Sequence, residues 1–201
     1  LAVLEALARS DRPLGVTELA TRLELGKSNV HRLLQALTEL GYAQRDEATS
    51  AYRATIRLWE LGSAVLGNLD LRDAAAPYME TLRERSRETV HLSILDGDEV
   101  VYVHKLDSPE PVRAYSQIGG RAPAYCVATG KAMLAWQGDA FLESLAGRLR
   151  HHSPNTIVDS QAFLREMERV RRNGFAVNRG EWRESVCGVA APVREPGGRV
   201  I

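Results

Sequence analysis

The sequence predicts an α+β chain with a small helical domain at its N-terminus, a helical connector and a larger mixed domain at its C-terminus. Three observations support this prediction. Apolar residues recur at helical spacing over residues 1–40, a helical pattern continues through 56–70, and apolar residues alternate with a period of two from Thr89. The length of 201 residues also fits two domains. We therefore expect domains at 1–55 and 71–201, joined by a linker helix over residues 56–70.

Two short amphipathic helices joined by a tight turn at Leu25-Gly26 are the most informative part of the N-terminal domain. The first helix buries Val16 and Leu19, and Thr17 is its expected N-cap. In the second helix the apolar residues fall at i, i+3, i+4, i+7 and i+10, and this spacing makes one stripe. The stripe consists of Val30, Leu33, Leu34, Leu37 and Leu40.

The segment after the second helix completes a recognisable module. Gly41 has the position and residue type of a C′ glycine that ends a helix. Residues 42–45 and 51–54 read as two strands around the polar turn 46–50. Together with an earlier helix that starts near Leu1, these elements predict a winged helix-turn-helix, whose second helix enters the major groove of DNA.

The outward face of the second helix and the wing supplies the candidate DNA-binding residues. From the helix, polar side chains could reach base edges or phosphates, and from the wing two arginines could follow the DNA backbone or minor groove. The candidates are Lys27, Ser28, Asn29, His31, Arg32, Gln35, Arg45 and Arg53. Net charge does not decide whether this face binds DNA, because residues 1–57 hold eight basic and seven acidic residues, a difference of +1. A merely solvated helical hairpin is the alternative interpretation.

Composition excludes several classes of protein. The chain has a formal net charge of zero and 44% hydrophobic residues, and it has no apolar run long enough for a membrane span and no signal-peptide pattern. Cys126 and Cys187 provide neither a disulfide framework nor a metal-binding spacing. We expect a cytoplasmic protein without a membrane partner, cofactor or metal. We also expect the sequence to be truncated at both ends, because it starts inside a helical pattern and ends inside a strand pattern.

The C-terminal part reads as a sheet with helices packed on it. A helix is expected over 71–87, followed by a β-hairpin whose arms, 89–95 and 99–106, flank an Asp-Gly turn. A third strand is expected over Val112 to Ser116. Further helices are expected at 128–136, 139–145 and 161–172, and further strands at 175–178 and 186–193. This order is typical of an α+β sensor-like domain.

Four motifs in the same order and spacing resemble those of the IclR family of bacterial transcription regulators. They are Leu-Gly-Lys-Ser-Asn-Val-His-Arg-Leu-Leu at 25–34, Gly-Tyr at 41–42, Ile-Gly-Gly-Arg-Ala-Pro-Ala-Tyr-Cys-Val-Ala-Thr-Gly-Lys-Ala-Met-Leu-Ala at 118–135, and Gly-Phe-Ala-Val-Asn-Arg-Gly-Glu-Trp at 174–182 followed by Val-Ala-Ala-Pro-Val at 189–193. The resemblance covers nearly the whole chain. It implies an N-terminal winged helix-turn-helix, a linker helix and a C-terminal GAF-like effector-binding domain, assembled as dimers or dimers of dimers.

The resemblance also implies a binding site for a small acid. The backbone at Ala128 and Thr129 would hold the effector carboxylate, which agrees with the affinity of helix starts for anions. The candidate effector-binding residues are Tyr125, Cys126, Ala128, Thr129, Asn178, Val186 and Gly188. Tyr125 stands where many relatives have His, Asn178 where some have an acid and Gly188 where some have Cys. Tyr125 and Trp182 favour a larger or aromatic acid over one of two or three carbons. A purely structural glycine-rich turn is the alternative.

These observations predict a ligand-responsive, sequence-specific DNA-binding regulator, expected to be a repressor, that senses a small organic or aromatic acid. The alternatives are a small-molecule-binding enzyme, with histidine bases and Cys126 as nucleophile, or a redox sensor that uses Cys126. The sequence contains no nucleophile elbow, HExxH motif or paired-cysteine metal signature. We therefore expect no catalytic residues and no enzyme activity.

Overall fold

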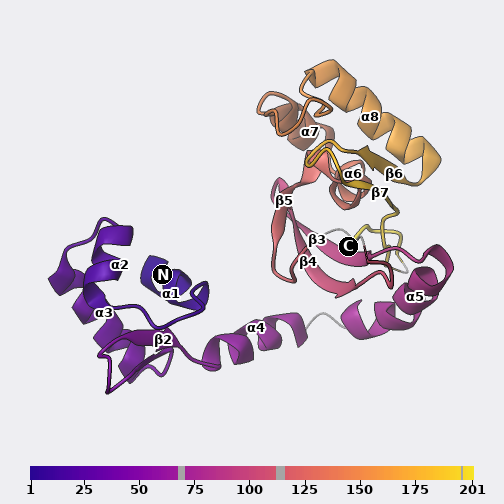
Figure 1. Cartoon of the computed structure of the whole chain (residues 1–201). Helices are drawn as coiled ribbons and strands as arrows, with labels where there is room; N and C mark the ends of the chain where they lie inside the picture. The colour runs from indigo at the N-terminus through magenta and orange to yellow at the C-terminus, as the bar shows by residue number, and fades with distance from the viewer. Residues whose placement is uncertain (68–70, 112–115, 196) are drawn as a thin grey trace. The chain divides into compact units, whose positions relative to one another are not determined.

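The computed structural model of the chain is shown in Figure 1 and describes residues 1–67, 71–111, 116–195 and 197–201. It divides into two compact units, Leu1–Asp70 and Leu71–Ile201. Each unit has a hydrophobic core of its own. The two units are therefore described separately.

The first unit contains the expected helices and hairpin. The elements are α1 (Ala2–Ala8), α2 (Val16–Arg22), α3 (Lys27–Glu39), β1 (Ala43–Arg45), β2 (Tyr52–Ala54) and α4 (Arg57–Gly67). β1 and β2 pair antiparallel, with Ala43 opposite Ala54 and Arg45 opposite Tyr52. The core collects apolar side chains from the first three helices and the hairpin, among them Leu7, Leu19, Val30, Leu34 and Tyr52. This is the winged helix-turn-helix that the sequence predicts.

Local chain geometry explains where these helices begin and end. Gly41 is the predicted C′ glycine: its φ is 77°, and the bonds Gly41 N–H to Thr38 O (3.0 Å) and Tyr42 N–H to Leu37 O (2.8 Å) close the end of α3. The prediction that Thr17 caps α2 is wrong, because α2 begins at Val16 and its N-cap is Gly15, two residues before Thr17. A backbone bridge from Leu14 to β2 fixes the chain immediately before Gly15, and the helix starts from there.

The second unit is built from two antiparallel sheets with helices between and around them. Its helices are α5 (Leu71–Ser86), α6 (Ala128–Leu134), α7 (Asp139–Ala146) and α8 (Ser160–Asn173), with a 3-10 turn η1 (Ala124–Cys126). β3 (Val90–Asp96), β4 (Glu99–Leu106) and β5 (Arg121–Pro123) form one sheet in the order β3-β4-β5, and β6 (Ala176–Arg179) pairs with β7 (Cys187–Ala190). Figure 1 shows β3 and β4 as the long paired strands of this unit.

Two of the predictions for this unit can be compared with the structure directly. The Asp-Gly hairpin is confirmed, since Gly97 sits at the turn between β3 and β4 with a φ of 64°. Among the described residues, the third strand of that sheet is β5 at 121–123. Residues 112–115 of the strand predicted at 112–116 lie outside the described residues. A three-residue strand bounded by Gly120 and Pro123 is too short to show an alternating pattern in the sequence.

Helix α6 occupies the centre of the second unit. It packs against η1, against β3 and β4 of the first sheet, against β6 and β7 of the second, and against α8. Every residue of α6 except Thr129 is classed as buried. The start of α6 is therefore enclosed by both sheets, and any site there is built from several segments of the chain. Among the described helices, none combines the length and apolarity that crossing a bilayer requires.

Candidate nucleic-acid interface and small-molecule site

Helix α3 presents a polar outer face. Val30 and Leu34 are 0% exposed and anchor the helix to the core of the first unit. The six predicted contact residues of this helix are all exposed: Lys27, Ser28, Asn29, His31, Arg32 and Gln35. The spacing places Leu33 and Leu40 in the buried stripe, but they are 41% and 59% exposed. Both lie along one edge of the stripe, and the core contacts its other side, where Val30 and Leu34 lie.

The side chains of this outer face are available for an external partner. Within the described part of the chain, no hydrogen bond or ion pair engages the side chains of Lys27, Asn29, His31 or Arg32, whereas Gln35 donates to Glu39 Oε1 at 3.2 Å. The first turn of α3 contains no acidic residue, and its N-cap, Gly26, has no side chain that could cover the turn's N–H groups. Such a helix start favours a phosphate oxygen.

The wing carries the two remaining predicted residues. Arg45 on β1 and Arg53 on β2 are both exposed, and each is held by one neighbour: Arg45 donates to Ser50 Oγ at 2.9 Å and Arg53 to Gln44 Oε1 at 3.2 Å. The turn between the strands is closed by Asp46, which accepts the Thr49 N–H at 2.9 Å. That hydrogen bond holds the pKa of Asp46 below its usual value. The wing therefore presents arginines from an ordered hairpin.

In the second unit the structure brings together residues that are far apart in the sequence. Ala128 and Thr129 open α6, while Asn178 on β6 lies opposite Gly188 on β7. A Cβ built on Gly188 would lie 3.9 Å from the Cβ of Ala128, so the second sheet touches the start of α6. Asn178 is buried, accepts the Glu181 N–H at 2.9 Å and donates to the Val186 carbonyl at 3.0 Å. Ala128, Asn178, Val186 and Gly188 thus belong to one region.

Two buried hydroxyl groups in this unit have no partner among the described residues. They are Thr129 Oγ1, at the start of α6, and Ser93 Oγ, on β3, the strand against which α6 packs. Buried polar groups without a partner are uncommon because leaving them unpaired is costly, and they often mark a binding site. Thr129 is among the residues predicted from the sequence, whereas Ser93 is not. Strict alternation places Ser93 on the face opposite Leu92, but the pairing register shifts between these two residues, and both are buried.

Tyr125 and Cys126 lie on η1, and both are buried. The hydroxyl of Tyr125 accepts the Arg150 N–H at 3.0 Å, donates to the Arg150 carbonyl at 3.1 Å and lies 3.0 Å from Nε2 of His152. Burial raises the pKa of Tyr125 above its usual value. The polar end of Tyr125 therefore joins η1 to residues 150–152.

The environment of Cys126 does not suit redox or nucleophilic chemistry. Its side chain is 0% exposed, and burial, with the charge of Glu181 as a second cause, raises the pKa of its thiol to about 12. Reactive cysteines have a lowered pKa and an accessible sulfur. The structure consequently gives no support to the alternative of a redox sensor that uses Cys126.

Gly130 has a packing role at the start of α6. A Cβ at this position would lie 2.1 Å from the carbonyl oxygen of Ala124 and 2.4 Å from its Cα, both of which are backbone atoms. Only glycine permits η1 to approach the helix this closely. The glycine of the Ala-Thr-Gly-Lys segment is thus required by the neighbouring turn.

A buried ionic cluster is centred on Lys131, on the same helix as Ala128 and Thr129, and the sequence pattern did not predict it. The ammonium of Lys131 is 2.7 and 2.9 Å from the two carboxylate oxygens of Glu181 and 3.1 Å from Glu166 Oε1. Arg169 also donates to Glu166, at 2.7 and 2.8 Å. Burial raises the pKa of Glu166, but the hydrogen bond from Arg169 and the charge of Lys131 outweigh burial, so this pKa lies below its usual value.

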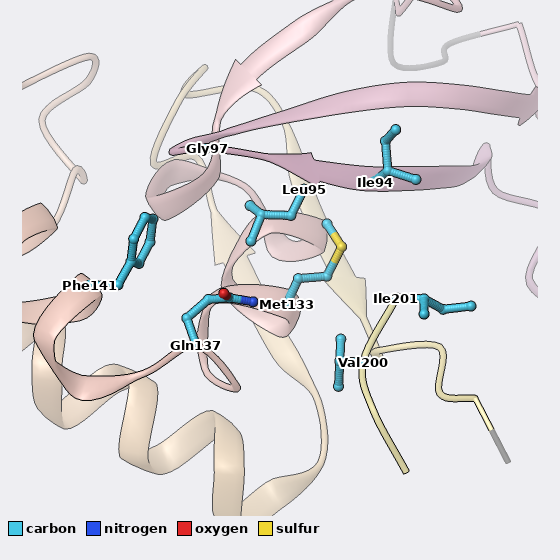
Figure 2. A pocket seen from close by; sticks show the side chains of 8 residues that line it. All are labelled: Ile94, Leu95, Gly97, Met133, Gln137, Phe141, Val200 and Ile201. Atoms are coloured by element: carbon cyan, nitrogen blue, oxygen red, sulfur yellow. The ribbon is translucent and has the colours of Figure 1, made fainter. Parts of the chain in front are cut away.

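Two cavities of the second unit are lined by residues other than the predicted effector-binding residues, and the second of them borders the ionic cluster. One, of about 300 Å³, is bounded by Ile94, Leu95, Gly97, Met133, Gln137, Phe141, Val200 and Ile201. Figure 2 shows Leu95 and Met133 in the middle of this lining, with Phe141 on one side and Val200 and Ile201 on the other. The second, of about 450 Å³, is bounded by Asn155, Ile157, Glu166, Arg169, Val177, Arg179 and Glu181. No cluster of His, Cys, Asp and Glu among the described residues is suited to hold a metal ion.

Comparison with known families and proteins gives a consistent result. The model described as the IclR helix-turn-helix domain matches residues 1–47, and the model described as the bacterial transcriptional regulator IclR C-terminal domain matches residues 63–201. The chain is 38% identical to the HTH-type transcriptional regulator KdgR of Escherichia coli over 99% of this chain and 76% of that protein. It is 33% identical to the regulator XynR of the same species, over 100% of this chain and 81% of that protein.

A similar solved structure agrees with these sequence matches. The crystal structure of an IclR homolog from Microbacterium hydrocarbonoxydans, complexed with 4-hydroxybenzoate, superposes with a TM-score of 0.87 at 28% identity. The match covers 99% of this chain and 83% of that one. The shared fold therefore extends over both units.

Proposed function

This chain belongs to the IclR family of bacterial transcription regulators, and we propose that it is a repressor whose hold on operator DNA is controlled by a small organic acid. As a member of that family it is a DNA-binding transcription regulator and not an enzyme. The proposal adds the sign of regulation, the class of effector and the residues that contact DNA and effector.

The exposed face of α3 is the observation that carries the proposal. Six polar residues of one helix are exposed, and five of them have side chains with no described intramolecular partner. Arg32, Asn29 and Gln35 have the side-chain types that read base edges in the major groove, and Lys27 and Ser28 suit phosphate contacts at the helix start. Arg45 and Arg53 would then contact the DNA backbone or minor groove from the wing.

We propose a homodimer, or a dimer of dimers, as the DNA-binding form. Helix-turn-helix proteins bind two half-sites through two-fold assemblies. The segment after the wing supports this, because Ile56 and Trp59 are 69% and 67% exposed and Leu61 is also exposed. Large apolar side chains gathered in one short segment are typical of interaction surfaces.

The effector is proposed to be a small organic acid, with an aromatic acid as the preferred class. The site comprises the predicted residues Tyr125, Cys126, Ala128, Thr129, Asn178, Val186 and Gly188. The unpartnered hydroxyl of Thr129 and the contact of Ala128 with Gly188 support this site. The complex of the related Microbacterium protein with 4-hydroxybenzoate supports the aromatic class. The acid would favour one arrangement of the two units over another and thereby change the population that fits the operator.

The proposal is tested in two steps. Operator sequences are first selected from random DNA with the purified protein, and gel-shift titrations at fixed salt then measure affinity with and without each member of a panel of organic acids, including 4-hydroxybenzoate. We expect one acid to stabilise the protein thermally and to lower its affinity for the selected DNA. Acids that stabilise the protein without changing DNA affinity would contradict the proposed control. An acid that raises DNA affinity would contradict the proposed sign.

Thr129→Val tests the proposed site in the same assays. This substitution keeps the shape of the side chain and removes a buried hydroxyl that has no described partner. The free energy of unfolding should stay unchanged or rise by about 1 kcal/mol, while effector affinity falls. A loss of effector affinity without a loss of stability would identify a hydroxyl that binds the ligand. Unchanged effector affinity would exclude Thr129 from hydrogen bonding to the ligand.

A further inference from the structure

We infer that Lys131 is the positioning residue of the effector site. Its buried ammonium holds the connection between β6 and β7 against the start of α6, and effector affinity depends on this contact. The inference rests on the proposed function, because the site that is positioned is the proposed effector site. Lys131 itself is not expected to touch the ligand.

The ammonium has no capacity left for a ligand. Its side chain is 1% exposed, and its contacts run to Glu181 Oε1, Glu181 Oε2 and Glu166 Oε1 at 2.7, 2.9 and 3.1 Å. An ammonium has three N–H donors, so these contacts use all of them. An effector carboxylate that approached Lys131 would have to displace Glu181 or Glu166, and Glu166 is already held by Arg169.

The partner of Lys131 is the centre of the β6–β7 connection. The Glu181 N–H donates to the side chain of Asn178, whose amide donates to the Val186 carbonyl, and the Gly180 N–H donates to the same carbonyl at 3.1 Å. Gly180 has a φ of 71°, and a Cβ there would lie 2.6 Å from the Glu184 carbonyl oxygen. The connection is thus a compact turn with internal hydrogen bonds that tie Asn178 and Val186 to Glu181.

The other end of the same contact is the proposed carboxylate-binding turn. Lys131 lies three residues after Ala128 and two after Thr129 in the first turns of α6. Lys131 and Glu181 therefore connect the two halves of the site, which are 50 residues apart in the sequence. A charged contact in a buried environment is short and directional, so it fixes the spacing of the two halves more closely than apolar packing would.

The connection is also held on its far side. Ser153 Oγ donates to the Gly180 carbonyl and Thr156 Oγ1 to the Glu181 carbonyl, both at 2.6 Å. Loss of the Lys131 contact should therefore loosen the connection from α6 without releasing it from residues 153–156. Removing the ammonium should therefore loosen the connection locally while the fold is retained.

The experiment compares Lys131→Met with the double variant Lys131→Met/Glu181→Gln. The single variant leaves the Glu181 carboxylate buried without its partner, which destabilises a protein strongly and can prevent folding. The double variant removes that unpaired charge. The matched control is Arg148→Met, which breaks the exposed ion pair of Arg148 with Asp98 (3.1 Å) in the same unit. Amide hydrogen exchange, thermal unfolding and binding of 4-hydroxybenzoate and the other acids of the panel are measured for each.

We expect the thermal stability of the double variant to be close to that of the control. Amide exchange over residues 178–186 should be faster by about tenfold. The dissociation constant of the bound acid should rise by about tenfold. Exchange over the β3–β4 hairpin should stay unchanged. If Lys131 had only a structural role, the double variant would regain wild-type effector affinity when it regained stability.

Effector affinity equal to wild type in the stable double variant would overturn the inference, and so would unchanged exchange over residues 178–186. Failure of the proposed function gives a different result. In that case wild type binds no acid of the panel, although the exchange measurement still shows whether Lys131 holds the connection.

Discussion

Leu14 and Tyr52 exchange two backbone hydrogen bonds, from Leu14 N–H to the Tyr52 carbonyl at 2.8 Å and from Tyr52 N–H to the Leu14 carbonyl at 2.9 Å. Leu14 precedes α2, and Tyr52 lies on the wing strand β2. This isolated bridge therefore adds a third segment to the two-stranded wing. Both side chains are buried in the core of the first unit, so the wing is fixed to the body of the helix-turn-helix.

Leu14→Ala should destabilise the first unit by about 2–5 kcal/mol, because it removes a 1%-exposed side chain from the core while keeping the backbone bridge. Urea unfolding, followed by hydrogen exchange of peptides from residues 1–54, measures the change. Leu40→Ala is the control, since Leu40 is 59% exposed and should shift stability by no more than about 0.5 kcal/mol. Equal effects of the two substitutions would contradict the assigned core.

Arg32→Ala should lower operator affinity by about 1–3 kcal/mol and leave the fold intact, because Arg32 lies on the exposed face of α3. Fluorescence anisotropy on selected operator DNA at several salt concentrations measures both the affinity and the number of phosphate contacts. Arg165→Ala on α8 is the matched control, since Arg165 is an exposed arginine of the second unit. Wild-type affinity in Arg32→Ala would show that the proposed DNA face is wrong.

Gly130→Ala should destabilise the second unit by about 3 kcal/mol or more, because the new Cβ meets the backbone of Ala124 and not a flexible side chain. Thermal unfolding followed by near-ultraviolet circular dichroism reports the change. In Gly147→Ala the new Cβ would meet the Ser144 carbonyl at an ordinary 3.7 Å, and this control should behave like wild type. A Gly130→Ala protein as stable as this control would refute the close packing of η1 on α6.

The two cysteines should react at very different rates. Cys187 is exposed and should be alkylated by iodoacetamide in the folded protein, whereas Cys126 should react only after unfolding. Peptide mass spectrometry after a short labelling pulse distinguishes them. Rapid labelling of Cys126 under native conditions would restore the alternative of a reactive thiol.

The raised pKa of Cys126 also predicts a dependence of stability on pH. The folded pKa is about 12, and an unfolded thiol has a pKa of about 8.5. The unfolded state therefore loses its proton first, so the contribution of this thiol to stability is complete below about pH 8.5 and declines as pH rises toward the folded value. Urea unfolding between pH 7 and pH 10 should show a steeper decline in wild type than in Cys126→Ala. Parallel curves for the two proteins would contradict the assigned burial.

Residues whose role depends on near neighbours in the chain could be predicted from the sequence. The spacing of Val30 and Leu34 fixes which face of α3 is buried, and the polar face follows from it. Gly41 and Gly97 occupy turn positions that need a positive φ, and the structure gives 77° and 64° for them. The motif at 118–135 located the start of α6, because that motif is continuous in the sequence.

Residues whose role depends on distant partners could not be predicted in this way. Spacing alone placed Leu33 in the buried stripe, but whether a stripe is covered along its full width depends on which elements pack against it. Ser93 was overlooked because its missing partner is a property of the folded interior. The predicted site residues Tyr125 and Thr129 were found by motif, yet only packing directs the Tyr125 hydroxyl to Arg150 and encloses that of Thr129.

The sequence by itself determined the periodic faces of the helices, the turn positions and the order of motifs, since each of these is written in residues a few positions apart. The tertiary structure alone decided that Lys131, a residue type normally found at the surface, is buried against Glu166 and Glu181. The physical reason is that burying a charge is tolerable only where opposite charges converge on it, and here those charges come from segments 35 and 50 residues away.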